Sequence, residues 1–269
     1  MAAFQTADLV RDLRDHLAIR PGDAIAVHAS MKSIGRVDGG PVALIDALIE
    51  AVGGPGLGTV LMPCFTAPAA ECHVRDTPCR LGLVAETFRT YPGVHLSPNH
   101  THRVAVFGKD AAAIVATHIG TAPLGVGSPF HELAKRGGIV LHIGCDLRSS
   151  SLIHVAEALS PLPYHDAQIT FPGYDRPIVL VHEDGRREVC PPRDNPGDSA
   201  GFLVLQREME RDGLLRRGRI GQAETIAVSG SQLLASAVAL LARDSTALLC
   251  DEVGCPVCPL KRAVARRRP

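Results

Sequence analysis

The residues best suited to chemistry in this sequence are a histidine and a glutamate three positions apart. His154 and Glu157 follow the serine run Ser149–Ser151, which is typical of a helix start, and a helix is predicted over 151–159. Positions three apart share one helical face, so Glu157 can accept a hydrogen bond from one ring nitrogen of His154. The positive end of the helix also disfavours a protonated ring. The pattern favours a general base with an orienting carboxylate, and a surface ion pair is the alternative.

The loop after a predicted strand over 24–28 is a second candidate site. The segment from His28 to Gly40 holds serines, a lysine and glycines, and it leads into a helix predicted over 41–52. Loops at the carboxyl ends of parallel strands bind ligands in open α/β folds. Glycines let the backbone approach a ligand, and the free N–H groups of a helix start suit a phosphate. The segment matches neither a Walker A loop nor a GxGxxG turn, so an ordinary connecting loop is the alternative.

Two more segments place polar residues beside predicted elements. Residues 127–129 (Gly-Ser-Pro) open a helix, which an ordinary turn and N-cap would also explain. Residues 95–102 contain three histidines just before a strand predicted over 103–107. These histidines lack the HExxH pattern or a comparable ligand spacing, so we assign no metal to them.

Eight cysteines are spread through the chain. Cys255 and Cys258 form a Cys-x-x-Cys motif, and Cys250 lies five residues before it. Three thiols could hold a zinc ion together with a fourth ligand from elsewhere. No second Cys-x-x-Cys motif supports such a site, and a chain of this length does not need disulfides. We therefore expect reduced thiols and assign no metal.

Alternating helical and strand patterns surround these residues and predict the fold. Predicted helices cover residues 6–18, 41–52, 83–90, 109–118, 151–159, 200–212 and 231–243. Predicted strands cover residues 24–28, 59–62, 103–107, 138–143, 178–182, 187–190 and 225–228. The order predicts an α/β fold with a mixed, largely parallel sheet flanked by helices, with an antiparallel hairpin addition at 178–190. One domain is expected over 1–243, followed by a basic, cysteine-containing tail over 244–269 whose end, 261–268, is solvated.

Composition excludes several classes of function. The chain has 269 residues, 46% of them hydrophobic, with 28 basic and 28 acidic side chains. A formal net charge of zero does not favour a nucleic-acid or membrane partner. Several charges within residues 1–20 argue against a signal peptide, and the apolar run Ala235–Leu241 is too short to span a bilayer. We expect a cytoplasmic protein, as a monomer or homodimer.

Taken together and in order, these segments resemble the antibiotic N-acetyltransferase family, which contains the aminoglycoside 3-N-acetyltransferases. The match runs through the chain from near residue 6 to near residue 243. The stretches that carry it are His28–Gly35 with Gly39 and Gly40, Thr59–Pro63 with Thr66, Gly127–Pro129, Leu152–Glu157, Gly218–Ala223, and the segment from Gly82 to Val94.

The resemblance implies an acetyl-coenzyme A-dependent N-acetyltransferase acting on the 3-amino group of an aminoglycoside. It implies that His154 deprotonates the acceptor amine with Glu157 as its partner, and that the amine attacks the thioester directly, without an acyl-enzyme. We assign to the cofactor His28, Ser30, Met31, Lys32, Ser33, Ile34, Gly35, Val37, Gly39, Gly40, Ser97, His102, Gly127, Ser128, Pro129 and Ser151. We assign to the acceptor Thr66, Glu71, Asp76 and Glu224.

The sequence departs from the family pattern at three positions. Asn99 and His100 stand where the family usually has histidine and proline, and Arg148 stands where an aspartate is common. The segment between Pro63 and Gly82, which helps to form the acceptor pocket in the family, is short and has mixed charge. A polycationic aminoglycoside favours carboxylates around it. The acceptor therefore stays open between an aminoglycoside and another small amine, such as an amino sugar or a biosynthetic intermediate.

Two other classes of function are compatible with parts of the sequence. A hydrolase could use Ser30 or Ser151 as its nucleophile, but the chain lacks a GxSxG elbow. A non-catalytic protein that binds coenzyme A or zinc is the other, and the intact pair of His154 and Glu157 argues against it.

Overall fold

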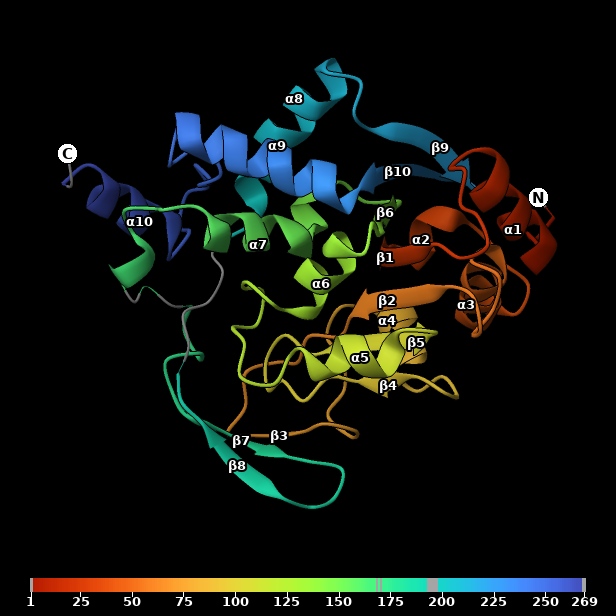
Figure 1. Ribbon diagram of the computed structural model, residues 1–269, viewed down its shortest axis with the longest axis horizontal. Helices are drawn as coiled ribbons and strands as arrows, with labels where there is room; N and C mark the ends of the chain where they lie inside the picture. Colours follow the sequence, from red (N-terminus) through yellow and green to blue (C-terminus); the bar gives the residue numbers. More distant parts are fainter. Residues whose placement is uncertain (1, 168, 170, 193–197, 268–269) are drawn as a thin grey trace.

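The computed structural model describes residues 2–167, 169, 171–192 and 198–267, and its centre is a seven-stranded sheet (Figure 1). Along the sheet the strands are β4 (His95–Leu96), β5 (Val104–Gly108), β2 (Thr59–Pro63), β1 (Ala24–Ala29), β6 (Ile139–Ile143), β10 (Ala223–Ser229) and β9 (Arg216–Ile220). The central strand β1 pairs in parallel with β2 and β6. The other four pairings, at both edges, are antiparallel.

The mixed α/β fold is confirmed, but its parallel portion is smaller than expected. Two of the six strand pairings are parallel. The connections from β4 to β5 and from β9 to β10 are too short for a crossover, so these two pairs are antiparallel. Gly221 and Gln222 alone join β9 to β10, and Gly221 adopts a positive φ of 57° that suits a tight turn. Strand β9 has the sequence Arg-Arg-Gly-Arg-Ile, which lacks the apolar alternation that would have predicted it.

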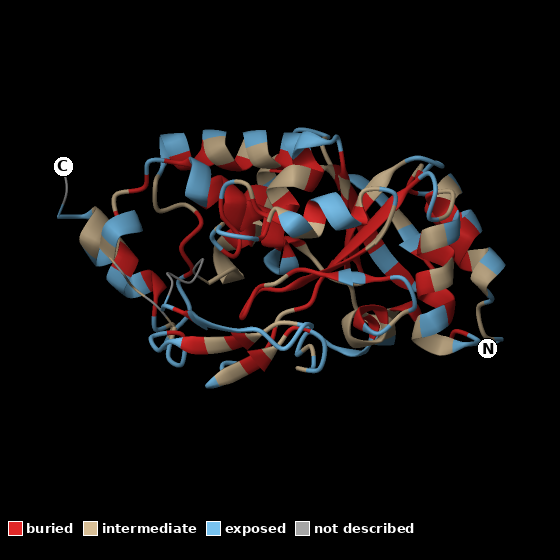
Figure 2. Cartoon of the chain, turned by 60° about the horizontal axis from the view of Figure 1, so that its bottom comes forward, coloured by how far each residue is buried: buried red, intermediate tan, exposed pale blue. Residues whose placement is uncertain are grey.

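Helices cover both faces of the sheet. They are α1 (Thr6–Asp15), α2 (Met31–Ile34), α3 (Gly40–Ala51), α4 (Leu83–Arg89), α5 (Ala111–Ala116), α6 (Pro129–Lys135), α7 (Ser151–Leu159), α8 (Leu203–Arg211), α9 (Gly230–Arg243) and α10 (Cys258–Ala265). Successive residues of β1 point to opposite sides: Ile25 and Val27 pack with α1 and α3, and Ala26 packs with α6, α7 and α9. Both sides of the central strands are therefore buried, as Figure 2 shows in red.

The predicted hairpin is confirmed, although it does not join the large sheet. Strands β7 (Ile178–Val181) and β8 (Arg187–Cys190) are antiparallel, and β7 also pairs in parallel with β3 (Glu71–His73). This small sheet lies apart from the large one, at the lower left of Figure 1. It links the segment after β2 to the segment before β7, and both segments contribute walls to the site described below.

The C-terminal segment packs onto the domain, and the expectation of a solvated end was wrong at Lys261. Leu248, Leu249 and Cys250 are buried with the helices α7, α8 and α9. Lys261 is also buried, and its ammonium group lies 5.3 Å from the centre of the Tyr164 ring. Across the described part of the chain, every helix is too short or too polar to cross a membrane.

Candidate active site

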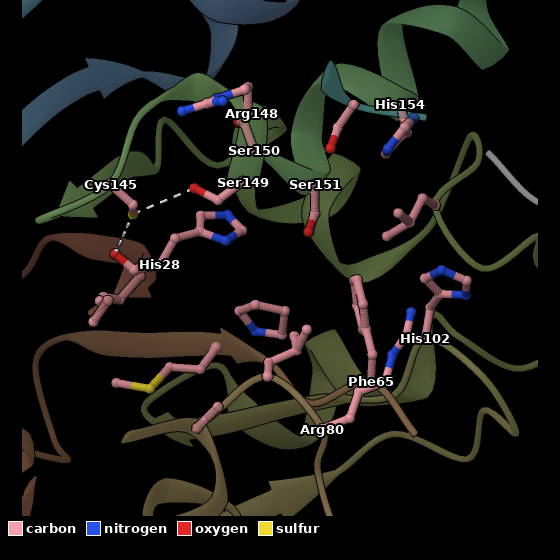
Figure 3. Close-up of a pocket in the computed structure, with 18 of the residues that line it drawn as sticks. His28, Phe65, Arg80, His102, Cys145, Arg148, Ser149, Ser150, Ser151 and His154 are labelled. Carbon is pink, nitrogen blue, oxygen red and sulfur yellow. Dashed lines mark hydrogen bonds between the residues drawn. The ribbon is translucent and has the colours of Figure 1, made fainter. Parts of the chain in front are cut away.

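A cleft of about 670 Å³ opens at the carboxyl ends of the three parallel strands. Ala29 ends β1, Pro63 ends β2 and Cys145 follows β6, and all three residues line the cleft. The first turn of α7 adds Ser151 and His154 (Figure 3). Ligands bind at this edge of the sheet in open α/β folds, which makes the cleft the candidate active site.

His154 and Glu157 form a hydrogen-bonded pair beside the cleft. His154 Nδ1 lies 2.6 Å from Oε2 of Glu157, and both side chains are buried. A carboxylate only accepts hydrogen bonds, so Nδ1 is the donor and Nε2 is left to take up a proton. The ring of Phe202 meets the imidazole edge-on, with 4.9 Å between the ring centres, and restricts its orientation. The arrangement is that of a base with its orienting group.

His102 lies across the pocket from His154 (Figure 3). Asn99 holds the turn that presents it, because Asn99 Oδ1 accepts the N–H groups of Thr101 at 3.0 Å and of His102 at 2.8 Å. Burial, with a smaller repulsion from His154, lowers the pKa of His102 to about 3. His102 is therefore a neutral hydrogen-bonding group at pH 7, and the departure at Asn99 preserves the turn that places it.

Two more buried histidines lie next to each other: His28 forms part of the inner wall of the cleft, and His142 stacks on it without being among the described lining residues. His28 of β1 and His142 of β6 are register partners, and their rings stack with centres 5.0 Å apart. Burial lowers the pKa of His142 to about 3 and holds that of His28 well below its usual range. His142 Nδ1 also lies 3.1 Å from Ser149 Oγ, which ties this wall to the segment before α7. The wall is therefore uncharged at neutral pH.

A second cavity meets the cleft at His154. It has a volume of about 280 Å³, and Glu157, Tyr164 and Lys261 are among its lining residues. His154 and Leu124 line both spaces. Two reactants can therefore reach the same imidazole from different sides, which suits a transfer reaction between two bound molecules.

Comparisons with known proteins agree with this geometry. The sequence model described as aminoglycoside 3-N-acetyltransferase matches residues 26–242. The chain belongs to the aminoglycoside 3-N-acetyltransferase family. Aminoglycoside N(3)-acetyltransferase IV of Salmonella sp is 27% identical over 90% of this chain and 88% of its own length. Aminoglycoside N(3)-acetyltransferase III of Pseudomonas aeruginosa is 30% identical over 82% of this chain and 88% of its own length.

Solved structures of the family share the fold. The apoenzyme of aminoglycoside acetyltransferase AAC(3)-IVa superposes with a TM-score of 0.80 at 26% identity, over 98% of this chain and 99% of that one. AAC-IIIb, solved as a binary complex with CoASH, gives a TM-score of 0.76 at 25% identity, over 90% and 97% of the two chains. The family consists of acyltransferases whose acetyl donor is acetyl-coenzyme A.

Among the residues assigned to the cofactor from the family resemblance, four line the cleft. They are His28, Ser30, His102 and Ser151. The segment that follows Ser30 instead builds the turn into α3: Ile34 and Val37 are buried in the core, and Lys32 is exposed. Its Met31 packs against the same core from a partly buried position.

The glycines of this segment shape the backbone and are not among the described residues that line the cleft. Gly35 ends α2 with a φ of 91°, and Gly39 precedes α3 with a φ of 79°. Gly40 then begins α3. Ser33 lines a neighbouring cavity of about 600 Å³, which shares Arg148 with the cleft.

The other cofactor candidates of the family pattern support loops. Ser97 Oγ accepts the N–H of Val104 at 2.9 Å, and this contact anchors the segment before β5. Gly127 N–H donates to His131 at 2.9 Å, and Ser128 and Pro129 begin α6. None of these four candidate residues is among the described residues that line the cleft.

The four acceptor candidates are not brought together. Thr66 is buried and its hydroxyl donates to the carbonyl of His100 at 2.9 Å. Glu71 pairs with Arg187 and His73 on the small sheet, Asp76 is exposed, and Glu224 pairs with Arg219 while lining the neighbouring cavity. The described lining of the cleft includes none of the four.

The structure places other side chains in the cleft that sequence reasoning did not assign. Arg80 and Arg148 are the cationic groups of its described lining, and Phe65 and Tyr174 add aromatic surface. Arg148 bonds Asp146 through two nitrogens, with Nη2 2.8 Å from Oδ2. The mixed-charge segment that contains Arg80 was a signal in the sequence, but nothing local indicated that Arg80 would reach His102 and His154.

Proposed function

We propose that this chain acetylates the 3-amino group of an aminoglycoside from acetyl-coenzyme A, with His154 as the general base. One observation carries the proposal: His154 is held by Glu157 at the point where two cavities meet. A base at that point contacts both a donor and an acceptor. The two-sided access also favours direct transfer over a hydrolase that binds one substrate.

The cleft and the neighbouring cavity fit a long anionic donor. Their volumes are about 670 and 600 Å³, and Arg148 lies between them as a cation for phosphate groups. Arg80 adds a second cation on the cleft wall. Acetyl-coenzyme A supplies the acetyl group as a thioester when it is bound. The uncharged wall at His28, with the neutral His142 stacked on it, suits the less polar part of such a molecule.

The proposed chemistry uses the His154–Glu157 pair in one proton cycle. The amine nitrogen forms a bond to the acetyl carbonyl carbon, and its proton passes to His154 Nε2. The Glu157 carboxylate stabilises the positive imidazole through the bond to Nδ1. As the carbon–sulfur bond breaks, the proton on Nε2 passes to the leaving thiolate. The base returns to its starting state, and no covalent enzyme intermediate forms.

The test is turnover with purified protein, acetyl-coenzyme A and aminoglycosides, followed by the release of free thiol. We expect His154→Ala to lower kcat roughly 100-fold or more, because it removes a general base. His95→Ala is the matched control, since His95 is exposed and lines neither cavity. An unchanged rate for His154→Ala would show that the proposed mechanism is wrong.

A second candidate is the same transfer to a small amine that carries less positive charge. It is favoured by the charges of the second cavity, where Glu157, already bonded to His154, is the carboxylate of the described lining and Lys261 adds a positive charge. Such a balance disfavours a polycation. A panel that includes amino sugars alongside aminoglycosides separates the two: turnover of amino sugars alone would replace the first acceptor with the second.

A further inference from the structure

Three cysteine thiols meet at the end of the chain, away from the parallel strands. The sulfur atoms of Cys250, Cys255 and Cys258 all lie within 4.8 Å of one another, and none of the three is in a disulfide. Cys250 and Cys258 are buried, and Cys255 is half-buried. Four ligands at zinc–sulfur distances of 2.3 Å place neighbouring sulfurs about 3.8 Å apart, so this cluster needs little movement to hold a metal.

A carboxylate lies beside one of the three sulfurs and can supply a fourth ligand after a small movement. Asp198 Oδ2 is 3.3 Å from Cys255 Sγ, although the two residues are far apart in the sequence. The other oxygen, Oδ1, accepts the N–H of Ala200 at 2.9 Å. A backbone bond to one oxygen fixes the carboxylate with its second oxygen turned toward the Cys255 sulfur, and ligating carboxylates are commonly held by such a bond.

The groups around the cluster suit bound thiolates. The N–H of Cys258 points to Cys255 Sγ at 3.4 Å, and Cys258 is the first residue of α10, where helical N–H groups favour negative charge. Three thiolates, one carboxylate and a divalent ion leave a net charge of two minus. Arg262 lies next to them, with its guanidinium 3.4 Å from the carbonyl oxygen of Cys250.

We propose that Cys250, Cys255, Cys258 and Asp198 bind one zinc ion. Thiolates select zinc over magnesium or calcium, and four protein ligands leave no open position, so the site is structural rather than catalytic. Binding releases the three thiol protons to solvent and needs no oxidant or reductant. The expectation of plain reduced thiols from the sequence rested on the lack of a second Cys-x-x-Cys motif. Folding supplies Asp198 in its place.

The proposed ion joins the C-terminal segment to the wall behind the candidate base. Asp198 lies just before the turn Ala200–Phe202, and Phe202 packs against His154. Gly201 in this turn lies directly against the backbone of Leu248, which leaves no room for a side chain there. Zinc would therefore hold the start of this turn, where Asp198 also lines the cleft, and its removal should loosen the contact between Phe202 and His154.

The first test measures metal in the full-length protein purified without chelators. We expect about one zinc ion per chain by elemental analysis. Titration of the native protein with a thiol reagent should detect three more reactive thiols after a strong chelator is added. Cobalt reconstitution should give the absorption bands of a tetrahedral, thiolate-bound ion.

Matched variants assign the ligands. Cys255→Ser should lose the bound zinc, and Asp198→Asn should weaken zinc binding at least 10-fold and shift the cobalt bands. Cys190→Ser and Asp251→Asn are the controls and should keep the metal: Cys190 is a buried thiol on the small sheet, and the Asp251 side chain is 93% exposed. Metal-free wild type that takes up no zinc on reconstitution, or equal metal loss in the controls, would overturn the proposal. An unchanged cobalt spectrum for Asp198→Asn would remove Asp198 from the ligand set.

Discussion

The substitution Glu157→Gln gives a sharp test of the proposed base. Glutamine is close to glutamate in size, and its carbonyl oxygen can still accept the Nδ1 proton of His154. The tautomer therefore stays the same, and only the negative charge is lost. The wild-type contact is a buried 2.6 Å hydrogen bond to a charged group, a class whose net contribution is about 1.5–3 kcal/mol.

The hydrogen bond contributes this free energy chiefly when the imidazole is positive. The imidazole becomes positive as it takes up the amine proton in the transition state. We therefore expect kcat to fall about 10- to 100-fold, with a smaller change in KM for acetyl-coenzyme A. Glu157→Ala should fall further, because it removes the group that orients the ring as well as the charge. Steady-state kinetics by thiol release measures both variants.

Controls separate this effect from general damage. Glu132→Gln changes a glutamate on α6 that pairs with Lys135 and Arg136, and it should leave kcat unchanged. Thermal unfolding of each variant shows whether Glu157→Gln remains folded at the assay temperature. A folded Glu157→Gln variant with wild-type kcat would refute the role given to the carboxylate.

Two further predictions concern charge in and around the cleft. His28, His102 and His142 are neutral when folded because burial lowers their pKa values, to about 3 for the latter two, from an ordinary 6.5. The contribution of His102 and His142 to stability is complete above pH 6.5 and is lost as the pH falls toward 3, at up to about 1.4 kcal/mol per pH unit for each ring. In denaturant titrations between about pH 4 and 6, His142→Gln should lower the slope of unfolding free energy against pH by about that amount. An unchanged slope for His142→Gln would contradict the argument. Arg80→Ala should raise KM for acetyl-coenzyme A about 10-fold with little change in kcat, and an unchanged KM would remove Arg80 from the donor site.

The sequence by itself determined the features that depend on local geometry. The pairing of His154 with Glu157 follows from helical spacing, because residues three apart on a helix face the same way wherever the helix lies. The apolar periodicity of the longer helices and of the central strands likewise predicted their positions, since burial on one or two faces leaves a repeating pattern. The motifs, in their order along the chain, also indicated the protein family.

Tertiary structure decided what depends on contacts between distant segments. His102 and Arg80 line the same cleft as His154 only through tertiary packing of distant segments, and no local pattern encodes that proximity. The antiparallel pairing of β9 with β10 depended on their short connection. The sequence of β9 has no apolar alternation, so it did not predict this strand. Asp198 likewise meets the cysteine cluster through packing at the end of the chain. Local hydrogen-bond geometry is repeated in every helix, whereas these contacts arise once, from the way this chain buries its particular surfaces.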